Sequence, residues 1–266
     1  MEKFGIAHLS QIAMRGEAAH RSEMVSQLLF GEAYEVLEVE NNWIKIRTAD
    51  CNYDGWIDKK LWNPISEEVM CNYCNTEKHF VKDLLLFIKE GSSGFTFPIF
   101  AGSTFPYPTD GEFSLGNRKY NLLVPENKQL NNNNTQLTDT QYAAINFATL
   151  FLNAPYLWGG RTPAGIDCSG FVQTIFKSIG IQLPRDASQQ IEWGKVVEFA
   201  FETQPCDVAF FSNEEGKIVH VGLILQPGEI IHASGNVRID AIDETGIFNR
   251  ELGTYTHNLR IIKRLL

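Results

Sequence analysis

The first part of the chain alternates short apolar runs with turn residues. The runs "AYEVLEVE", "NWIKIRT" and "DGWIDKKLW" are rich in β-branched and aromatic residues, and "NN" and "DCNYDG" between them favour turns. Short strands at intervals of about ten residues predict a small β-barrel over residues 1–65. A second series, "DLLLFIKEG", "FTFPIFAGSTFP" and "GEFSLGNRKYNLLV", is punctuated by glycines and predicts another small barrel over residues 66–125.

The pattern changes after residue 125. The stretch "ENKQLNNNNTQL" contains four consecutive asparagines, so residues 126–137 are predicted to be a linker. Beyond it, "TDTQYAAINFATLFLNAPY" and "CSGFVQTIFKSIG" place apolar residues at helical spacing, and "DVAFFS", "VHVGLILQ", "EIIHASG" and "HNLRIIKRLL" are typical of strands. Helices followed by antiparallel strands predict an α+β domain over residues 138–266. The expected fold is therefore multidomain.

Charge and composition exclude several classes of function. The net charge is −9, whereas a nucleic-acid-binding protein or one that docks on anionic lipid is expected to carry a basic face. No apolar run approaches the ~18 residues of a membrane span, and no secretory signal is visible at the start. We expect a cytoplasmic protein, or a periplasmic one if a signal peptide has been removed. Five cysteines, an odd number in a long chain, fit a reducing compartment better than a disulfide framework.

Cys71 and Cys74 form an isolated C-x-x-C in "VMCNYCN". A structural zinc site needs two further ligands, and the sequence has no second pair of suitable spacing. A thioredoxin-like role needs a strand before the pair and a helix that begins at it, but "NPISEEVMCNYCN" is typical of an acidic connector. The interpretation that we favour is two free thiols in a linker, with no metal and no cofactor.

Cys168 lies where the loop "GGRTPAGID" meets the start of a predicted helix. A thiol at a helix N-terminus lies at the positive end of the helix dipole, which favours a lowered pKa and a reactive thiolate. The free backbone N–H groups of that turn are also able to bind an oxyanion. A buried structural cysteine is the alternative. Cys206, which follows a proline at the start of a strand, has no helix to activate it.

Two histidines interrupt apolar, strand-like runs: His220 in "IVHVGLIL" and His232 in "EIIHAS". A buried imidazole needs hydrogen-bond partners. If the two runs are adjacent antiparallel strands joined by "QPGE", one histidine is able to contact the thiol while the other orients it. Two satisfied core histidines remain the alternative. The other histidines lie in polar, loop-like surroundings and are assigned no role: His8, His20, His79 and His257.

The blocks "YLWGGRTPAGIDCSGFVQTIF", "HVGLIL" and "IHASG" occur in order, and with them residues 138–266 resemble the NlpC-type family of papain-like cysteine peptidases. The resemblance implies a nucleophile at Cys168, a base at His220 and a polar orienting residue at His232. It also implies that Tyr156, in "YLWGG", lies against the nucleophile. Members of this family hydrolyse the peptide stems of bacterial murein, usually between D-γ-glutamate and a diamino acid.

The two N-terminal barrels sharpen the resemblance. Bacterial SH3-like modules before the peptidase domain resemble the γ-D-glutamyl-L-diamino acid endopeptidases, in which the first module closes one end of the cleft so that only peptides with a free N-terminal L-alanine fit. The resemblance implies that Glu23, Tyr53 and Asp186 bind the alanine ammonium, which suits carboxylate and phenol oxygens. Asp167 and Ser169 match the family's D-C-S; they are expected to fix the loop and bind substrate, and Asp167 is also a candidate helix cap.

The leading hypothesis is a monomeric cysteine peptidase that acts on murein peptides in cell-wall recycling or scavenging. One alternative is a cell-wall binding protein whose peptidase domain is an inactive scaffold. Another is a thiol amidase or acyltransferase that uses the same residues on a different acyl donor. Intact candidates at Cys168, His220 and His232 weigh against the scaffold.

Overall fold

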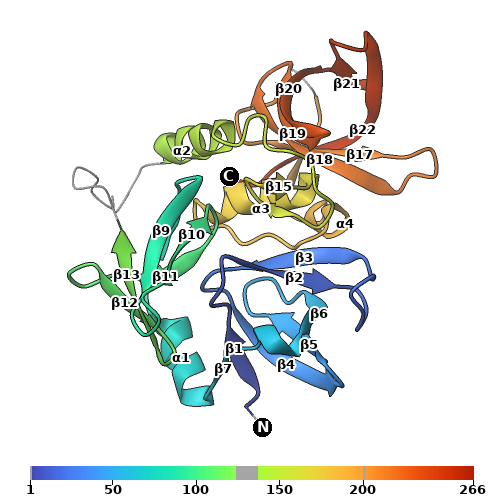
Figure 1. Cartoon of the computed structure of the whole chain (residues 1–266). Helices are drawn as coiled ribbons and strands as arrows, with labels where there is room; N and C mark the ends of the chain where they lie inside the picture. The colour runs from blue at the N-terminus through green and yellow to red at the C-terminus, as the bar shows by residue number, and fades with distance from the viewer. Residues whose placement is uncertain (1, 124–136, 200–201) are drawn as a thin grey trace. The chain divides into compact units, whose positions relative to one another are not determined.

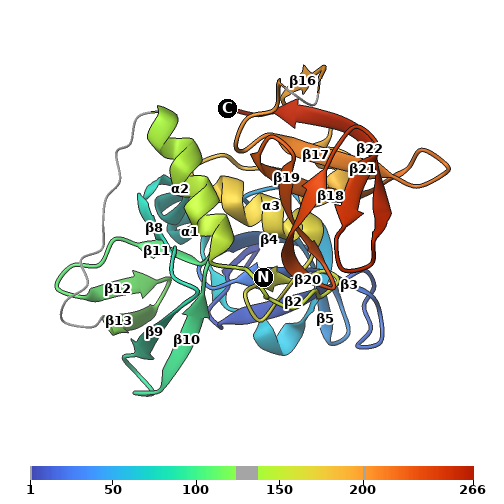
Figure 2. The same cartoon turned by 90° about the horizontal axis from the view of Figure 1, so that it is seen from above.

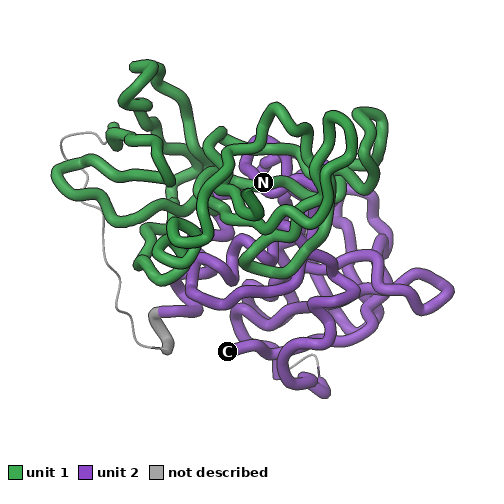
Figure 3. The backbone as a smooth tube through the Cα atoms, turned by 90° about the horizontal axis from the view of Figure 1, so that it is seen from below, with its two compact units in different colours: residues 1–132 green, residues 133–266 purple. Residues whose placement is uncertain are grey.

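The computed structural model describes residues 2–123, 137–199 and 202–266. The chain forms two compact units, Met1–Asn132 and Asn133–Leu266, shown in green and purple in Figure 3. The predicted linker at 126–137 lies almost wholly outside the described residues. The predicted boundary between residues 65 and 66 falls inside the first unit and stays a prediction.

Seven strands form the first sheet of the N-terminal unit, in the order β3-β2-β6-β5-β4-β1-β7. Adjacent strands of this sheet are antiparallel, as in the pairing of β4 with β5. Asn41, with φ of 49°, lies in the turn between β4 and β5, as the "NN" sequence predicts. The strands are β1 (Phe4–Ile6), β2 (Gln11–Arg15), β3 (Met24–Leu29), β4 (Ala33–Glu40), β5 (Trp43–Thr48), β6 (Asp54–Asp58) and β7 (Pro64–Ile65), with a 3₁₀ turn, η1 (Lys59–Leu61), after β6.

A four-stranded sheet, β10-β9-β13-β12, and a two-stranded one, β11-β8, contain the other described strands of this unit. One cluster of buried apolar side chains joins these strands to the first sheet, because it includes Ile6 of β1 together with Phe105, Phe113 and Tyr120 of the second set. The strands are β8 (Lys78–Phe80), β9 (Leu85–Glu90), β10 (Thr96–Phe100), β11 (Thr104–Pro106), β12 (Glu112–Leu115) and β13 (Arg118–Leu123).

These sheets confirm a β-rich N-terminal half but not two closed barrels. Among the described residues, the hydrogen-bonded order of the first sheet runs from β3 to β7 without returning to β3, and the second set is divided between two sheets. The strands are short, and the shared apolar cluster packs the two sets of strands against one another. Side-chain packing therefore holds this unit together where backbone pairing stops.

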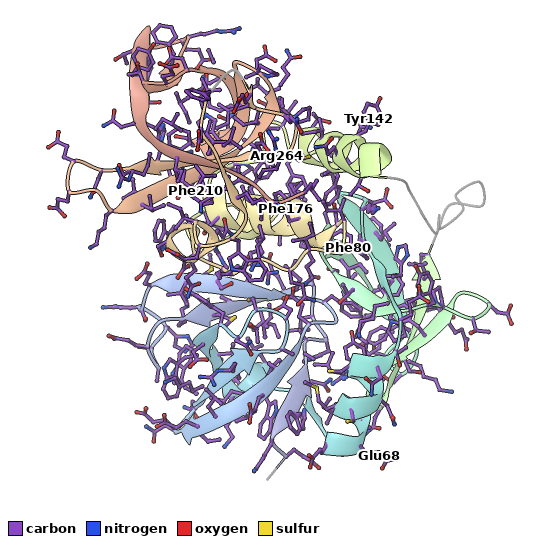
Figure 4. All side chains as sticks on the ribbon, turned by 180° about the vertical axis from the view of Figure 1, so that it is seen from behind. Glu68, Phe80, Tyr142, Phe176, Phe210 and Arg264 are labelled. Carbon is purple, nitrogen blue, oxygen red and sulfur yellow. The ribbon has the colours of Figure 1, made fainter. Side chains whose placement is uncertain are left out.

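A helix, α1 (Glu67–Asn75), occupies the stretch predicted to be a connector, so that prediction is wrong. The Ser66 side chain accepts a hydrogen bond from the backbone N–H of Val69, and Glu67 and Glu68 lie in the first turn, where the helix dipole favours negative charge. Glu68 lies on the exposed side of this helix, as Figure 4 shows. Cys71 and Cys74 are free thiols, as expected, but they are exposed on a helix.

The C-terminal unit is built on a seven-stranded antiparallel sheet, β16-β22-β17-β18-β19-β20-β21. An additional pairing of β21 with β22 closes six of these strands into a barrel, which is the one closed sheet in the described parts of the chain (Figure 2). The strands are β16 (Lys195–Val197), β17 (Val208–Ser212), β18 (Ile218–Gln226), β19 (Glu229–Ser234), β20 (Asn236–Ile242), β21 (Gly246–Asn249) and β22 (Thr254–Arg264).

In the described part of this unit, three α-helices and a two-stranded ribbon accompany the barrel, so the α+β prediction is confirmed. They are α2 (Leu137–Thr149), β14 (Arg161–Thr162), β15 (Gly165–Ile166), α3 (Cys168–Lys177) and α4 (Ala187–Gln190). Helix α3 packs against β18 and β19 and is buried from Cys168 to Phe176 (Figure 1). Figure 4 labels Phe176 on α3 and Phe210 on β17, both buried in this unit, whereas Tyr142 points outward from α2.

No helix within the described residues is long and apolar enough to span a membrane.

Candidate active site

Helix α3 begins at Cys168, and Asp167 is its N-cap. One carboxylate oxygen of Asp167 accepts a hydrogen bond from the backbone N–H of Gly170 at 2.7 Å, as the capping prediction requires. The other oxygen accepts from the N–H of Gly159 at 2.8 Å and so ties the preceding loop to the helix. A Cβ atom at Gly170 would lie 2.5 Å from the carbonyl oxygen of Gly160, so only glycine allows this close approach.

Arg185 fixes the same carboxylate from the opposite side. Its Nη1 and Nη2 donate to the two oxygens of Asp167 at 3.0 and 2.5 Å, and Nη1 also donates to Oγ of Ser169 at 2.9 Å. Both charged side chains are buried, with 2% of Arg185 and 7% of Asp167 exposed. A bidentate pair at such depth is rigid, and removal of one partner leaves an uncompensated buried charge. The residues that flank the nucleophile candidate are therefore held in one geometry.

The Cys168 thiol is not the low-pKa thiolate that the helix position predicts. Burial raises its pKa to about 11, and the adjacent Asp167 carboxylate acts in the same direction. Backbone hydrogen bonds from Val221 and Ser169, with the charge of Arg185, oppose the shift without overcoming it. The expectation fails because the helix begins inside the protein beside its own capping carboxylate, so desolvation of the thiolate outweighs the dipole. The thiol faces the backbone of β18 at Val221, the residue after His220.

His220 and His232 lie on adjacent antiparallel strands, as predicted. The hairpin β18–β19 pairs Gly222 with His232, and the turn between the strands contains Gly228 with φ of 83°. Nε2 of His220 lies 2.9 Å from Nδ1 of His232, and both rings are buried, with 4% and 0% exposed. Burial, with the neighbouring His232 and His257, lowers the pKa of His220 well below 6.5. His220 is therefore a neutral imidazole at neutral pH.

A buried carboxylate continues this chain of hydrogen bonds. Nε2 of His232 lies 3.1 Å from Oδ2 of Asp240 on β20. Arg238, two residues earlier on the same strand, donates from Nε to Oδ2 at 2.6 Å and from Nη2 to Oδ1 at 3.1 Å. Burial alone raises the pKa of Asp240, but hydrogen bonds from His232 and Arg238 and the Arg238 charge outweigh it and bring the pKa to about 2. Asp240 is therefore ionised at neutral and mildly acidic pH.

The other predicted site residues fall into two groups. Tyr156 lies near the nucleophile candidate, because burial first and then Cys168 and Asp167 raise the pKa of its phenol. Asp186 is the N-cap residue of α4, where its backbone N–H lies 3.5 Å from Oε1 of Gln189. Glu23 and Tyr53 belong to the other unit, before β3 and β6. The structure describes each unit by itself, so an ammonium site shared by Glu23, Tyr53 and Asp186 stays a prediction.

Four residues of this region were missed by the sequence reasoning: Arg185, Arg238, Asp240 and His257. Arg238 and Asp240 carried a usable signal, because opposite charges two residues apart in the strand-like "NVRIDAI" lie on the same face of a strand. His257, assigned to polar surroundings, lies on β22 with its ring 4.1 Å from that of His220. No local pattern indicates that contact, since the two residues are far apart in the sequence and are brought together by the sheet order β18-β17-β22.

Within the described ranges, no group of three or more histidine, cysteine, aspartate or glutamate side chains is arranged to hold a metal ion. The cluster offers the elements of thiol chemistry instead: a cysteine at a helix start, a neutral imidazole and a chain of hydrogen bonds that ends in a carboxylate.

Comparison with known proteins supports this chemistry. Residues 153–255 match the NlpC/P60 family, and residues 14–60 match the bacterial dipeptidyl-peptidase Sh3 domain. The chain is 31% identical over 255 residues to the gamma-D-glutamyl-L-lysine dipeptidyl-peptidase of Bacillus subtilis (strain 168). The aligned region covers 85% of this chain and 78% of that protein. It is 25% identical over 258 residues to the protein of the same name in Bacillus cereus (strain ATCC 10987 / NRS 248), with 87% and 74% covered.

The fold has a counterpart among solved structures. A crystal structure of an NlpC/P60 family protein from Bacillus cereus ATCC 10987 aligns with 99% of both chains, with a TM-score of 0.79 and 20% identity. The first module is thus a bacterial Sh3 domain by sequence, and the resemblance noted in the catalytic blocks is confirmed. The chain belongs to the NlpC/P60 family and is a cysteine peptidase.

Proposed function

We propose that this enzyme cleaves the bond between D-γ-glutamate and a diamino acid in murein peptides that begin with a free L-alanine. The observation that carries the substrate assignment is the match to the Bacillus subtilis gamma-D-glutamyl-L-lysine dipeptidyl-peptidase, which extends over both units of this chain. In this proposal Cys168 is the nucleophile, His220 is the base and His232 orients the base. The proposal is supported by the position of Cys168 at the start of α3 and by its contact with β18 beside His220.

The hydrogen-bond chain determines which nitrogen of His220 is the base. Ionised Asp240 is only an acceptor, so Nε2 of His232 carries a proton that it donates to the carboxylate. In the tautomer that we propose for catalysis, Nδ1 of His232 carries no proton and accepts the hydrogen bond that Nε2–H of His220 donates. This arrangement leaves the lone pair of His220 on Nδ1. The proposal therefore assigns Nδ1 of His220 as the atom that takes the thiol proton, while Nε2 is held by His232.

The raised pKa of Cys168 and the lowered pKa of His220 favour a neutral pair in the free enzyme. Nδ1 of His220 then takes the proton of the thiol as sulfur attacks the γ-carbonyl carbon of D-glutamate. Backbone N–H groups at the start of α3 are suited to stabilise the oxyanion. Collapse of the tetrahedral intermediate releases the amine of the diamino acid, which takes the proton from His220. Nδ1 of His220 then takes a proton from water, the resulting hydroxide attacks the thioester carbon, and the Cys168 sulfur leaves and takes that proton back from His220.

Specificity in this proposal comes from Glu23 and Tyr53 of the first module together with Asp186 of the peptidase unit, which bind the ammonium of the N-terminal L-alanine. Tyr156 and Ser169 bind the substrate beside the nucleophile. Asp167 has both oxygens occupied by Arg185 and backbone N–H groups, so its role is to hold the loop, with substrate contacts left to its neighbours. We further propose that the sheets of residues 66–125 form a second SH3-like module.

The test is hydrolysis of L-Ala-γ-D-Glu-L-Lys and of the corresponding diaminopimelate peptide, followed by mass spectrometry. We expect L-Ala-γ-D-Glu and the free diamino acid as products, and no cleavage by the Cys168→Ala variant. The His232→Ala variant is expected to lose less activity than His220→Ala, because it orients the base without transferring the reacting proton. If both peptides stay intact while the folded wild type cleaves a different acyl substrate, the proposed specificity is wrong.

A further inference from the structure

A third histidine ring lies against the base. The rings of His257 and His220 are nearly parallel, with centroids 4.1 Å apart and an interplanar angle of 29°. His257 also meets the edge of His232 at 5.7 Å, and Phe211 on β17 lies 5.7 Å from His220 and 5.9 Å from His257. His220 is therefore packed through its flat face by His257 and bonded through its Nε2 edge by His232.

Irregularities in the barrel surround this stack. In the pairing of β22 with β21, Ile247 faces His257 and Phe248 faces Tyr255, so Thr256 is an extra residue on β22. In the pairing of β17 with β22, Phe210 faces Ile261 and Phe211 faces Leu259, so Arg260 is a second extra residue. The two β-bulges lie on either side of His257, and bulges commonly re-aim a side chain beside an active site.

The backbone at this position is also tightly constrained. Gly246 on β21 has φ of 148°, and a Cβ atom there would lie 1.8 Å from the carbonyl oxygen of His257. Strand β18 carries a bulge of its own at Val219, directly before His220. Both rings of the stack thus come from irregular points of their strands, and a regular ladder would aim the two side chains differently.

The surroundings keep His257 uncharged. The titratable groups that face it are His220 on β18, His232 on β19 and, at longer range, Asp240 on β20, whose charge is shared with Arg238. Burial lowers the pKa of His257 to about 4, His232 acts in the same direction, and Asp240 opposes them. Nδ1 of His257 lies 2.9 Å from Oγ1 of Thr256. A neutral ring beside His220 leaves the positive charge of the reaction free to form on His220.

We propose that His257 is a positioning residue, whose neutral ring stacks on His220 and holds Nδ1 of that base toward the thiol. The inference rests on the proposed function only in taking His220 as the base. His257 does not touch the reacting atoms and acts through the orientation and the charge of His220. A buried imidazole held at one edge by a single hydrogen bond is still able to tilt about that bond, and the stacked ring removes this freedom.

The test compares two substitutions at one position. His257→Ala removes the stacked ring, and we expect kcat to fall about 10- to 100-fold with KM nearly unchanged, because small displacements of reacting groups are costly. His257→Phe restores a flat ring that does not titrate, so it is expected to recover most of the lost kcat.

A control variant comes from the same strand. Tyr255→Ala removes a ring that meets Phe248 edge to face, with centroids 5.3 Å apart, on the same β21–β22 ribbon but outside the stack of histidine rings. It is expected to leave kcat unchanged. The inference is overturned if folded His257→Ala keeps the kcat of the wild type, or if His257→Phe is as impaired as His257→Ala.

A second measurement separates this inference from the proposed substrate. The rate at which iodoacetamide alkylates Cys168, followed by peptide mapping, reports on the thiol and its base without any peptide substrate. We expect His257→Ala to change the pH dependence of that rate and His257→Phe to restore it in part. If the wild type cleaves none of the murein peptides, the proposed function fails, but an altered alkylation profile in His257→Ala still supports the positioning role. An unaltered profile contradicts it.

Discussion

Replacement of Asp240 by alanine tests the hydrogen-bond chain at its far end, without touching the thiol or the base. The carboxylate accepts from Nε2 of His232, a ring that is completely buried. In its absence the proton on Nε2 loses the acceptor that the structure gives it, and a buried donor left unsatisfied costs about 1–3 kcal/mol. The ring avoids that cost by moving its proton to Nδ1.

The change of tautomer at His232 reaches the base directly. With a proton on its Nδ1, His232 becomes a donor to Nε2 of His220, whose own proton then moves to Nδ1. The edge of His220 that must accept the thiol proton carries a proton instead. Restoring the reactive tautomer costs about the same 1–3 kcal/mol, so we expect kcat/KM of Asp240→Ala to fall about 5- to 150-fold. KM should change little, because Asp240 does not reach the substrate.

The assay is the pH–rate profile of kcat/KM for L-Ala-γ-D-Glu-L-Lys, with the folded fraction checked by circular dichroism. Asp207→Ala is the matched control, because Asp207 is also a buried carboxylate, with 1% of its side chain exposed, and accepts two hydrogen bonds from Arg264 at 2.9 and 2.8 Å. Its loss should lower stability but not kcat/KM. If folded Asp240→Ala matches the wild type, the tautomer argument is refuted.

The remaining predictions concern the nucleophile, the buried ion pair, alkaline stability and specificity. Cys168→Ala and His220→Ala should each abolish turnover in a folded protein, and residual wild-type rates in either would contradict their assigned roles. Arg185→Met should lower the free energy of unfolding by about 3–5 kcal/mol, measured in urea, because it leaves a buried carboxylate unpaired. Burial raises the pKa of Cys168 to about 11 and that of Cys206 to about 12, so the folded state keeps protons that the unfolded chain loses above pH 9. The free energy of unfolding should therefore be constant below pH 9 and fall by about 1.4 kcal/mol per pH unit and thiol as the pH rises toward 11. A constant unfolding free energy from pH 9 to 11 would refute the burial of these thiols. Tyr53→Phe should reduce the preference for peptides with a free N-terminal L-alanine over N-acetylated ones in competition assays. An unchanged preference would show that Tyr53 of the first module does not bind the alanine ammonium.

Local pattern was sufficient for the elements that carry the chemistry. Asp167 before an apolar helix predicted the cap of α3, and two histidines on runs joined by "QPGE" predicted a hairpin that sets them side by side. Both inferences depend on neighbours within about fifteen residues, where spacing determines which side chains share a face. Helix α1 was missed because the acidic start of its sequence was taken for a connector, although Ser66 and the two glutamates are an ordinary helix beginning.

What could not be predicted depends on the order of distant strands in the sheet and on burial. His257 meets His220 because β22, the last strand, pairs with β17 and so lies next but one to β18. The pKa of Cys168 depends on how deeply α3 is buried, a quantity that no local pattern gives, and there desolvation reversed the effect expected from the dipole. The cytoplasmic location, the monomeric state and the shared ammonium site stay predictions.

The central claim is that Cys168 is the nucleophile of a peptidase. Its most direct test is the parallel measurement of activity loss and of alkylation at each cysteine during treatment with iodoacetamide. Cys71 and Cys74 are exposed and react first if exposure alone matters, whereas Cys168 is buried. If Cys168 is the nucleophile, we expect activity to disappear with the rate constant of Cys168 modification and bound substrate to slow both processes equally. Full activity in protein whose Cys168 is completely alkylated would contradict it.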